Sequence, residues 1–108
     1  MLKKYDLPPC PVETCLTLMG DRWKLLIVRD LLTGKKRFGE LRNSLTGISQ
    51  KVLTQHLRIM EENGLVNREV FAQVPPKVEY SLTELGRSLK SIHDAMWKWG
   101  EEYKAKMF

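Results

Sequence analysis

Polar side chains that can bind nucleic acid lie on one face of a predicted helix over residues 49–63. At 100° per residue, Leu53, Leu57 and Met60 point to one side and predict its buried face. The opposite side offers hydroxyl, amide and cationic groups that can bond base edges in a major groove, and the cations can also hold phosphate. We therefore expect this face to contact DNA. Its members are Lys51, Thr54, Gln55 and Arg58, with Ser49 and Gln50 at the N-terminal edge.

The excess of positive charge falls on the same part of the chain. With 18 Lys and Arg against 13 Asp and Glu, the formal net charge of the 108 residues is +5. Residues 35–58 alone hold six basic side chains and one acid, so the rest of the chain is close to neutral. A solvated basic face is the alternative interpretation. Against it, the acids of the helix over 49–63 come only at its far end, at Glu61 and Glu62, and this pattern favours an anionic partner.

Further cations fall on neighbouring elements. Three of them precede a short predicted helix over residues 38–44, and in a helix-turn-helix that helix crosses the DNA backbone. Two more fall on predicted strands, where plain surface charge is an equal alternative. The full set of predicted DNA contacts is Lys35, Lys36, Arg37, Ser49, Gln50, Lys51, Thr54, Gln55, Arg58, Arg68 and Lys77.

Caps and apolar periodicity predict the first helices. Pro11 suits the first position of a helix that ends at Gly20, because its missing N–H has no partner there in any case. Asp21 is expected to cap a second, largely buried helix that runs to about Leu32.

The helix over 49–63 has the clearest start, and a hairpin follows it. Ser49 is the expected N-cap, and Ile48 and Leu53 can form a hydrophobic staple across it. After this helix the apolar period changes from helical to alternating over residues 66–71 and 77–82. We expect two strands joined by a projecting tip.

One long last helix is expected to begin after Thr83 as its cap. Its apolar residues repeat at spacings of four and three over about five turns, which is more than a small core needs. Part of this stripe is therefore expected to pack against another subunit. The alternative is that it packs only within the core of its own chain. The stripe is Leu85, Leu89, Ile92, Met96, Trp99 and Tyr103, and the last five are the predicted dimer interface.

This order of elements is typical of a winged helix-turn-helix. The expected fold class is mainly α with a small β-hairpin, comprising a three-helix DNA-binding core and terminal dimerisation helices. The length suits one domain over residues 1–108. We expect an arm and helix over 1–20, the core over 21–82 and a dimerisation helix over 83–108.

The sequence resembles the HxlR-type winged helix-turn-helix transcriptional regulators, which are relatives of the MarR group. The resemblance covers residues 10–99, and the family pattern commonly has Gly-Gly-Lys-Trp where this chain has Gly20-Asp21-Arg22-Trp23. The other matching segments are Cys10-Pro11-Val12, Arg37-Phe38-Gly39-Glu40-Leu41, Gly47-Ile48-Ser49-Gln50-Lys51-Val52-Leu53-Thr54, Leu57-Arg58, Glu61-Glu62-Asn63-Gly64-Leu65-Val66-Asn67-Arg68, Val74-Pro75-Pro76-Lys77-Val78-Glu79-Tyr80 and Leu82-Thr83-Glu84-Leu85-Gly86.

The resemblance implies a homodimer joined through its terminal helices and bound to a pseudo-palindromic double-stranded operator near a promoter, with repression as the expected outcome. It implies that the segment from Ser49 to Arg58 enters the major groove and that the hairpin with Pro75 and Pro76 reaches a flanking groove. A winged-helix module that binds protein and not DNA is the alternative.

Cys10 matches the cysteine that some members of the family use to sense oxidants or electrophiles. A thiol at a helix N-terminus beside Lys3 and Lys4 is favoured as thiolate, the reactive form. An inert capping cysteine is the alternative, and Cys15 is expected to be a small core residue. A bridge between Cys10 and Cys15 within one helix is geometrically poor. Oxidation is therefore expected to link subunits or to cap Cys10 with a small thiol.

The sequence offers no sign of catalysis, metal binding or membrane insertion. It contains no recognisable triad, metal-ligand spacing or Gly-rich phosphate loop, and its two histidines, His56 and His93, are far apart. No apolar run is long enough to cross a bilayer, and no signal-peptide pattern opens the chain. We expect a cytoplasmic protein that is not an enzyme and needs no cofactor, with His56 in a structural role or near DNA.

Overall fold

The structure is a computed structural model and describes residues 6–108. These residues form six helices and one antiparallel hairpin. Lys3 and Lys4, which we expected beside Cys10, lie outside these residues. The elements are α1 (Pro11–Met19), α2 (Lys24–Leu31), α3 (Phe38–Ser44), α4 (Gln50–Glu62), β1 (Val66–Phe71), β2 (Lys77–Leu82), α5 (Glu84–Arg87) and α6 (Lys90–Met107). The order confirms the mainly α, winged helix-turn-helix fold class.

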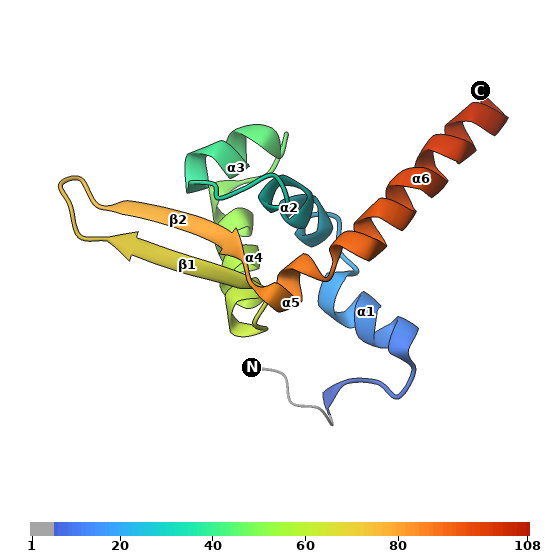
Figure 1. Cartoon of the computed structure of the whole chain (residues 1–108), viewed down its shortest axis with the longest axis horizontal. Coiled ribbons are helices and arrows are strands. Elements are labelled where there is room, and N and C mark those ends of the chain that lie inside the picture. Colours follow the sequence, from blue (N-terminus) through green and yellow to red (C-terminus); the bar gives the residue numbers. More distant parts are fainter. Residues whose placement is uncertain (1–5) are drawn as a thin grey trace.

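The core is formed by α2, α3, α4 and the base of the hairpin (Figure 1). In α4 the predicted buried face is confirmed, because Leu53 and Met60 have no exposed surface and Leu57 has 2%. The other buried apolar residues are Met19, Ile27, Val28, Leu31, Leu41, Leu45, Ile48, Leu65, Val66, Tyr80 and Leu82.

The start and end of α4 follow from local chemistry. The Ser49 hydroxyl accepts a hydrogen bond from the Val52 N–H at 3.1 Å, as expected of an N-cap. Ile48, the residue before this cap, is buried. The helix ends before Gly64, whose φ of 77° is in the left-handed region that glycine adopts without strain. These contacts fix where α4 begins and which side it exposes.

The hairpin occupies the predicted residues, with a register from Val66 opposite Leu82 to Phe71 opposite Lys77. A short bridge joins it to the segment before α3, because Lys36 and Tyr80 exchange both backbone hydrogen bonds, at 3.0 and 2.8 Å. The tip is exposed, and Val74 is fully accessible. The bridge fixes the base of the hairpin against α3.

The second helix begins two residues later than predicted, at Lys24. Asp21 nevertheless caps it, because its carboxylate accepts hydrogen bonds from the backbone N–H groups of Trp23 and Lys24, at 2.8 and 2.9 Å. The Lys24 ammonium adds a contact of 2.6 Å to the same carboxylate. The cap was therefore predicted correctly, while the first turn of the helix was not.

The prediction of one long last helix was wrong, because α5 and α6 are separate. The Thr83 hydroxyl accepts from the Gly86 N–H and donates to the Gly64 carbonyl, which fixes α5 to the loop after α4. A Cβ on Gly86 would lie 2.1 Å from the carbonyl oxygen of Leu65, so α5 packs directly on that backbone. The Ser88 hydroxyl then donates to the Leu85 carbonyl and competes with helical bonding. The apolar stripe is therefore broken between α5 and α6.

The α6 helix extends away from the core on the side opposite to the hairpin tip (Figure 1). It packs on α2, but none of its residues is buried. In α1 only Met19 of the apolar face is buried, while Val12 and Leu16 are exposed. Cys15, expected in the core, is half-buried. Both terminal elements thus expose apolar side chains.

No helix between residues 6 and 108 has the length and hydropathy required to cross a membrane.

Candidate nucleic-acid interface

The outward face of α4 presents the predicted polar side chains to solvent. Packing of the opposite face against the core fixes this orientation. Thr54 is half-buried and lines a hollow with Arg68 and Tyr80 of the hairpin. The exposed members are Ser49, Gln50, Lys51, Gln55 and Arg58. The face is thus free to accept a partner from outside the chain.

The three cations before α3 stand beside the hairpin. Lys36 is bound to the Tyr80 backbone, and Lys35 and Arg37 flank it with exposed side chains. The only acid of the basic segment, Glu40, accepts a hydrogen bond from the Arg37 N–H at 2.9 Å and so caps α3. Its carboxylate therefore stabilises the N-terminus of α3.

Arg68 joins the two groups of predicted contacts. It lines a hollow of about 380 Å³ with Lys35, and a second hollow of about 340 Å³ with Thr54 and Arg58. Lys77 is not a lining residue of either hollow. Its ammonium lies 4.9 Å from the centre of the Phe71 ring and pairs with a neighbouring carboxylate on β2. The structure thus brings α4 and the base of the hairpin together and leaves Lys77 farther out.

His56 links α4 to the start of α2. Its Nε2 lies 3.9 Å from the Asp21 carboxylate, and its Nδ1 is buried without a hydrogen-bond partner among residues 6–108. Burial lowers the pKa of His56, the Lys24 charge lowers it further, and Asp21 opposes both. For Asp21, burial alone would raise the pKa, but the hydrogen bonds from Lys24 and Trp23 outweigh burial and lower it. The sequence predicted a structural role or a place near DNA for His56, but it did not indicate this partner.

The two cysteines lie on α1 and its cap and form no disulfide. Cys10 is exposed at the N-cap of α1 and makes no capping hydrogen bond through its side chain. Its thiol is therefore accessible to reagents in solution. Among residues 6–108 no cluster of His, Cys, Asp and Glu is arranged to hold a metal ion.

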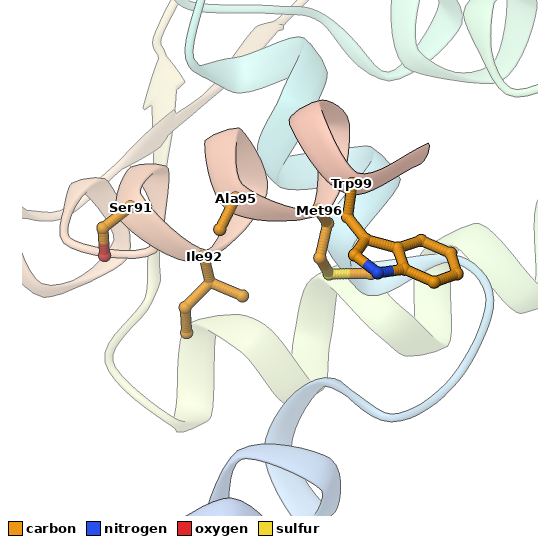
Figure 2. A pocket seen from close by; sticks show the side chains of 5 residues that line it. All are labelled: Ser91, Ile92, Ala95, Met96 and Trp99. Atoms are coloured by element: carbon orange, nitrogen blue, oxygen red, sulfur yellow. The ribbon is translucent and has the colours of Figure 1, made fainter. Parts of the chain in front are cut away.

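An apolar surface lies on the exposed side of α6. Figure 2 shows Ile92, Met96 and Trp99 along one side of the helix with Ser91 and Ala95, around an open hollow of about 430 Å³. The stripe continues beyond it, because the Trp99 and Tyr103 rings stack with their centres 5.4 Å apart. Large exposed apolar patches of this kind mark sites of association.

A capped, outward-facing helix followed by a two-stranded hairpin defines the class of winged helix-turn-helix proteins. The sequence model of the HxlR-like helix-turn-helix family matches residues 18–108, and the chain belongs to that family.

Similar proteins are transcriptional regulators. The uncharacterized HTH-type transcriptional regulator YdeP of Bacillus subtilis (strain 168) is 49% identical over 102 residues, which cover 94% of this chain and 80% of YdeP. YybR of the same organism is 51% identical over 105 residues, covering 94% and 84%.

Two redox-related structures are also similar. The redox regulator HypR in its reduced form matches with a TM-score of 0.84 and 48% identity, over 88% of this chain and 94% of HypR. Reduced YodB from B. subtilis matches with a TM-score of 0.76 and 38% identity, over 89% of this chain and 95% of YodB.

We expect His56 to make folding stability sensitive to acid. Because the pKa of His56 is lowered in the folded state, the unfolded chain binds the proton first as the pH falls through the ordinary value of 6.5. The free energy of unfolding should therefore be highest above that value and decline towards the lower folded pKa. Urea titrations at about pH 7.5 and about pH 5.5 measure the decline.

The matched variant is His56→Gln, which keeps a polar side chain and removes the titration. It should lose less stability between the two pH values than the wild type. Equal losses in the two proteins would contradict the role of His56.

Proposed function

We propose that the chain is a sequence-specific double-stranded DNA-binding regulator whose contacts are made by α4 and the hairpin. The main support is the orientation of α4. Its inner face is buried, and it presents Lys51, Gln55 and Arg58 outward beside the hairpin. Such a helix can lie in a major groove while cations before α3 and on β1 meet phosphates. Membership of a helix-turn-helix regulator family supports this.

We also propose that two copies act together, joined through the terminal helices. The exposed stripe of α6 supports a homodimer, since a second copy would cover side chains that the single chain leaves in water. A twofold pair would read a pseudo-palindromic operator whose half-sites lie about 34–36 Å apart or a multiple of that distance. The proposed interface is Leu89, Ile92, Met96, Trp99 and Tyr103. Of these, Met96, Trp99 and Tyr103 are exposed, while Leu89 is partly buried against the core of its own chain.

In this proposal the winged helix-turn-helix core comprises residues 21–82, between an arm and helix over 1–20 and a dimerisation segment over 83–108. Binding near a promoter would exclude polymerase, so repression is the proposed outcome.

The proposal extends to control by thiol chemistry at Cys10. An exposed thiol at the start of α1 supports it. HypR is described as a redox regulator in reduced and oxidized forms, and YodB has reduced and diamide-treated structures. Diamide takes up two hydrogen atoms and joins two thiols as a disulfide, so Cys10 would link to a thiol of the partner or to a small thiol.

Removing either outward cation of α4 should weaken DNA binding. Lys51→Ala and Arg58→Ala are each expected to raise the Kd about five- to tenfold while the fold is kept, because both side chains point away from the core. Mobility-shift titrations against fragments selected from genomic DNA measure this. The logarithm of affinity should fall with the logarithm of salt with a slope of about −0.9 per phosphate neutralised.

Lys98→Ala is the matched control, since Lys98 is an exposed cation on α6. Unchanged affinity in both α4 variants would show that α4 is not the recognition helix. Salt-independent behaviour without retention on heparin would favour a protein-binding module.

Treatment with diamide should release DNA from the wild type and from Cys15→Ser, but not from Cys10→Ser. The reason is that Cys10 is exposed whereas Cys15 is half-buried. Mobility shifts before and after treatment, followed by reduction with dithiothreitol, measure the response. Equal release from Cys10→Ser and the wild type would remove Cys10 from the mechanism.

A further inference from the structure

Two arginines from different elements line one hollow between α4 and the hairpin. Arg58 comes from α4 and Arg68 from β1, and the hollow measures about 340 Å³. Neither guanidinium forms an ion pair with any side chain of residues 6–108. Like charges on two different elements repel each other, and an anion between them would relieve the repulsion.

Buried residues and a backbone bridge hold the walls of this hollow in place. Leu57 and Tyr80 line it and are both largely buried, with 2% and 9% of their surface exposed. Tyr80 is also fixed by the backbone bridge to Lys36. The backbone positions that carry the two arginines are therefore set by the core and by α4 packing on β1.

The remaining polar groups suit an oxyanion. Thr54 and Tyr80 both line the hollow, and their hydroxyls form no hydrogen bond with other residues of the described chain. Hydroxyls and guanidinium forks are donors that match phosphate oxygens. One acid, Glu61, also lines the hollow, so the formal charge of its lining is +1. This charge is equal and opposite to that of one phosphodiester.

We propose that the hollow between Arg58 and Arg68 is a binding site for a single phosphate group, whose affinity Glu61 limits. The phosphate can come from the DNA backbone or from free phosphate in solution, so the two sources compete for one site. The inference rests on the proposed DNA binding for the first source only. It assigns Arg58 to the phosphate backbone and leaves base contacts to the part of α4 that carries Lys51 and Gln55.

The first experiment uses inorganic phosphate and the wild-type chain without DNA. Backbone ¹H–¹⁵N NMR signals around Thr54, Arg58 and Arg68 should shift saturably with phosphate, but not with chloride at equal ionic strength. Arg58→Gln and Arg68→Gln should each abolish the saturable shift. Arg42→Gln, which removes an exposed arginine of α3 that does not line the hollow, should keep it.

A gain in affinity provides a test that loss of folding cannot imitate. Glu61→Gln should tighten phosphate binding about threefold, because it removes the one negative charge of the site. Glu62→Gln, which replaces the neighbouring acid outside the hollow, should change the phosphate affinity by less than half as much. The proposal would be overturned if the shifts are absent or if they spread over all basic residues alike. It would also be overturned if Glu61→Gln and Glu62→Gln change the phosphate affinity equally.

The second experiment measures DNA affinity for Arg58→Gln, Arg68→Gln and the double variant. If both arginines hold one phosphate, the double variant should lose clearly less than the product of the two single losses. Independent, multiplicative losses would overturn the shared site. Phosphate binding without DNA binding would refute the proposed function alone, whereas DNA binding without the phosphate response would refute this site alone.

Discussion

Met96, Trp99 and Tyr103 expose 58%, 66% and 46% of their surface along one side of α6. Removing apolar surface from water is worth about 25 cal/mol per Å², so this stripe favours association with another apolar surface. The α6 helix gains its direction from the break after α5 and from its packing on α2. The stripe is therefore presented in the direction that this packing gives to α6. If a second copy covers it, the relative placement of the two α4 helices follows from this single constraint.

Within one chain, packing of the core fixes the positions of the polar surface residues. Side chains of α4 without exposed surface hold its inner face, and Ser49 fixes where its first turn begins. The bridge between Lys36 and Tyr80 then ties the hairpin to α3. Rigid elements thus position the polar groups, and pre-organised groups lose little entropy on binding. His56 and Asp21 connect this surface to the segment that follows α1.

Much of the fold was predictable because its signals are local. The bounds of α3, β1 and β2 and the cap of α4 follow from periodicity and capping residues close in sequence. The break between α5 and α6 was not predictable in this way, since it depends on Gly86 packing on the Leu65 carbonyl and on Thr83 bonding to Gly64. The contact of His56 with Asp21 and the hollow that Arg58 and Arg68 both line likewise depend on how separate elements pack together. The sequence indicated which residues are polar and exposed, but not which of them converge, and their contacts with DNA remain predictions.

Sedimentation velocity of the wild type and of two tryptophan variants tests the central claim, that two copies join through the stripe of α6. The wild type should sediment with twice the chain mass of 12.6 kDa. Trp99→Lys should shift it towards the monomer because it places a charge in the stripe. Trp97→Lys should not, because Trp97 lies on another side of α6, where it donates a hydrogen bond to Glu101. A wild type that sediments as a monomer, or a dimer that Trp99→Lys leaves intact, would contradict the account.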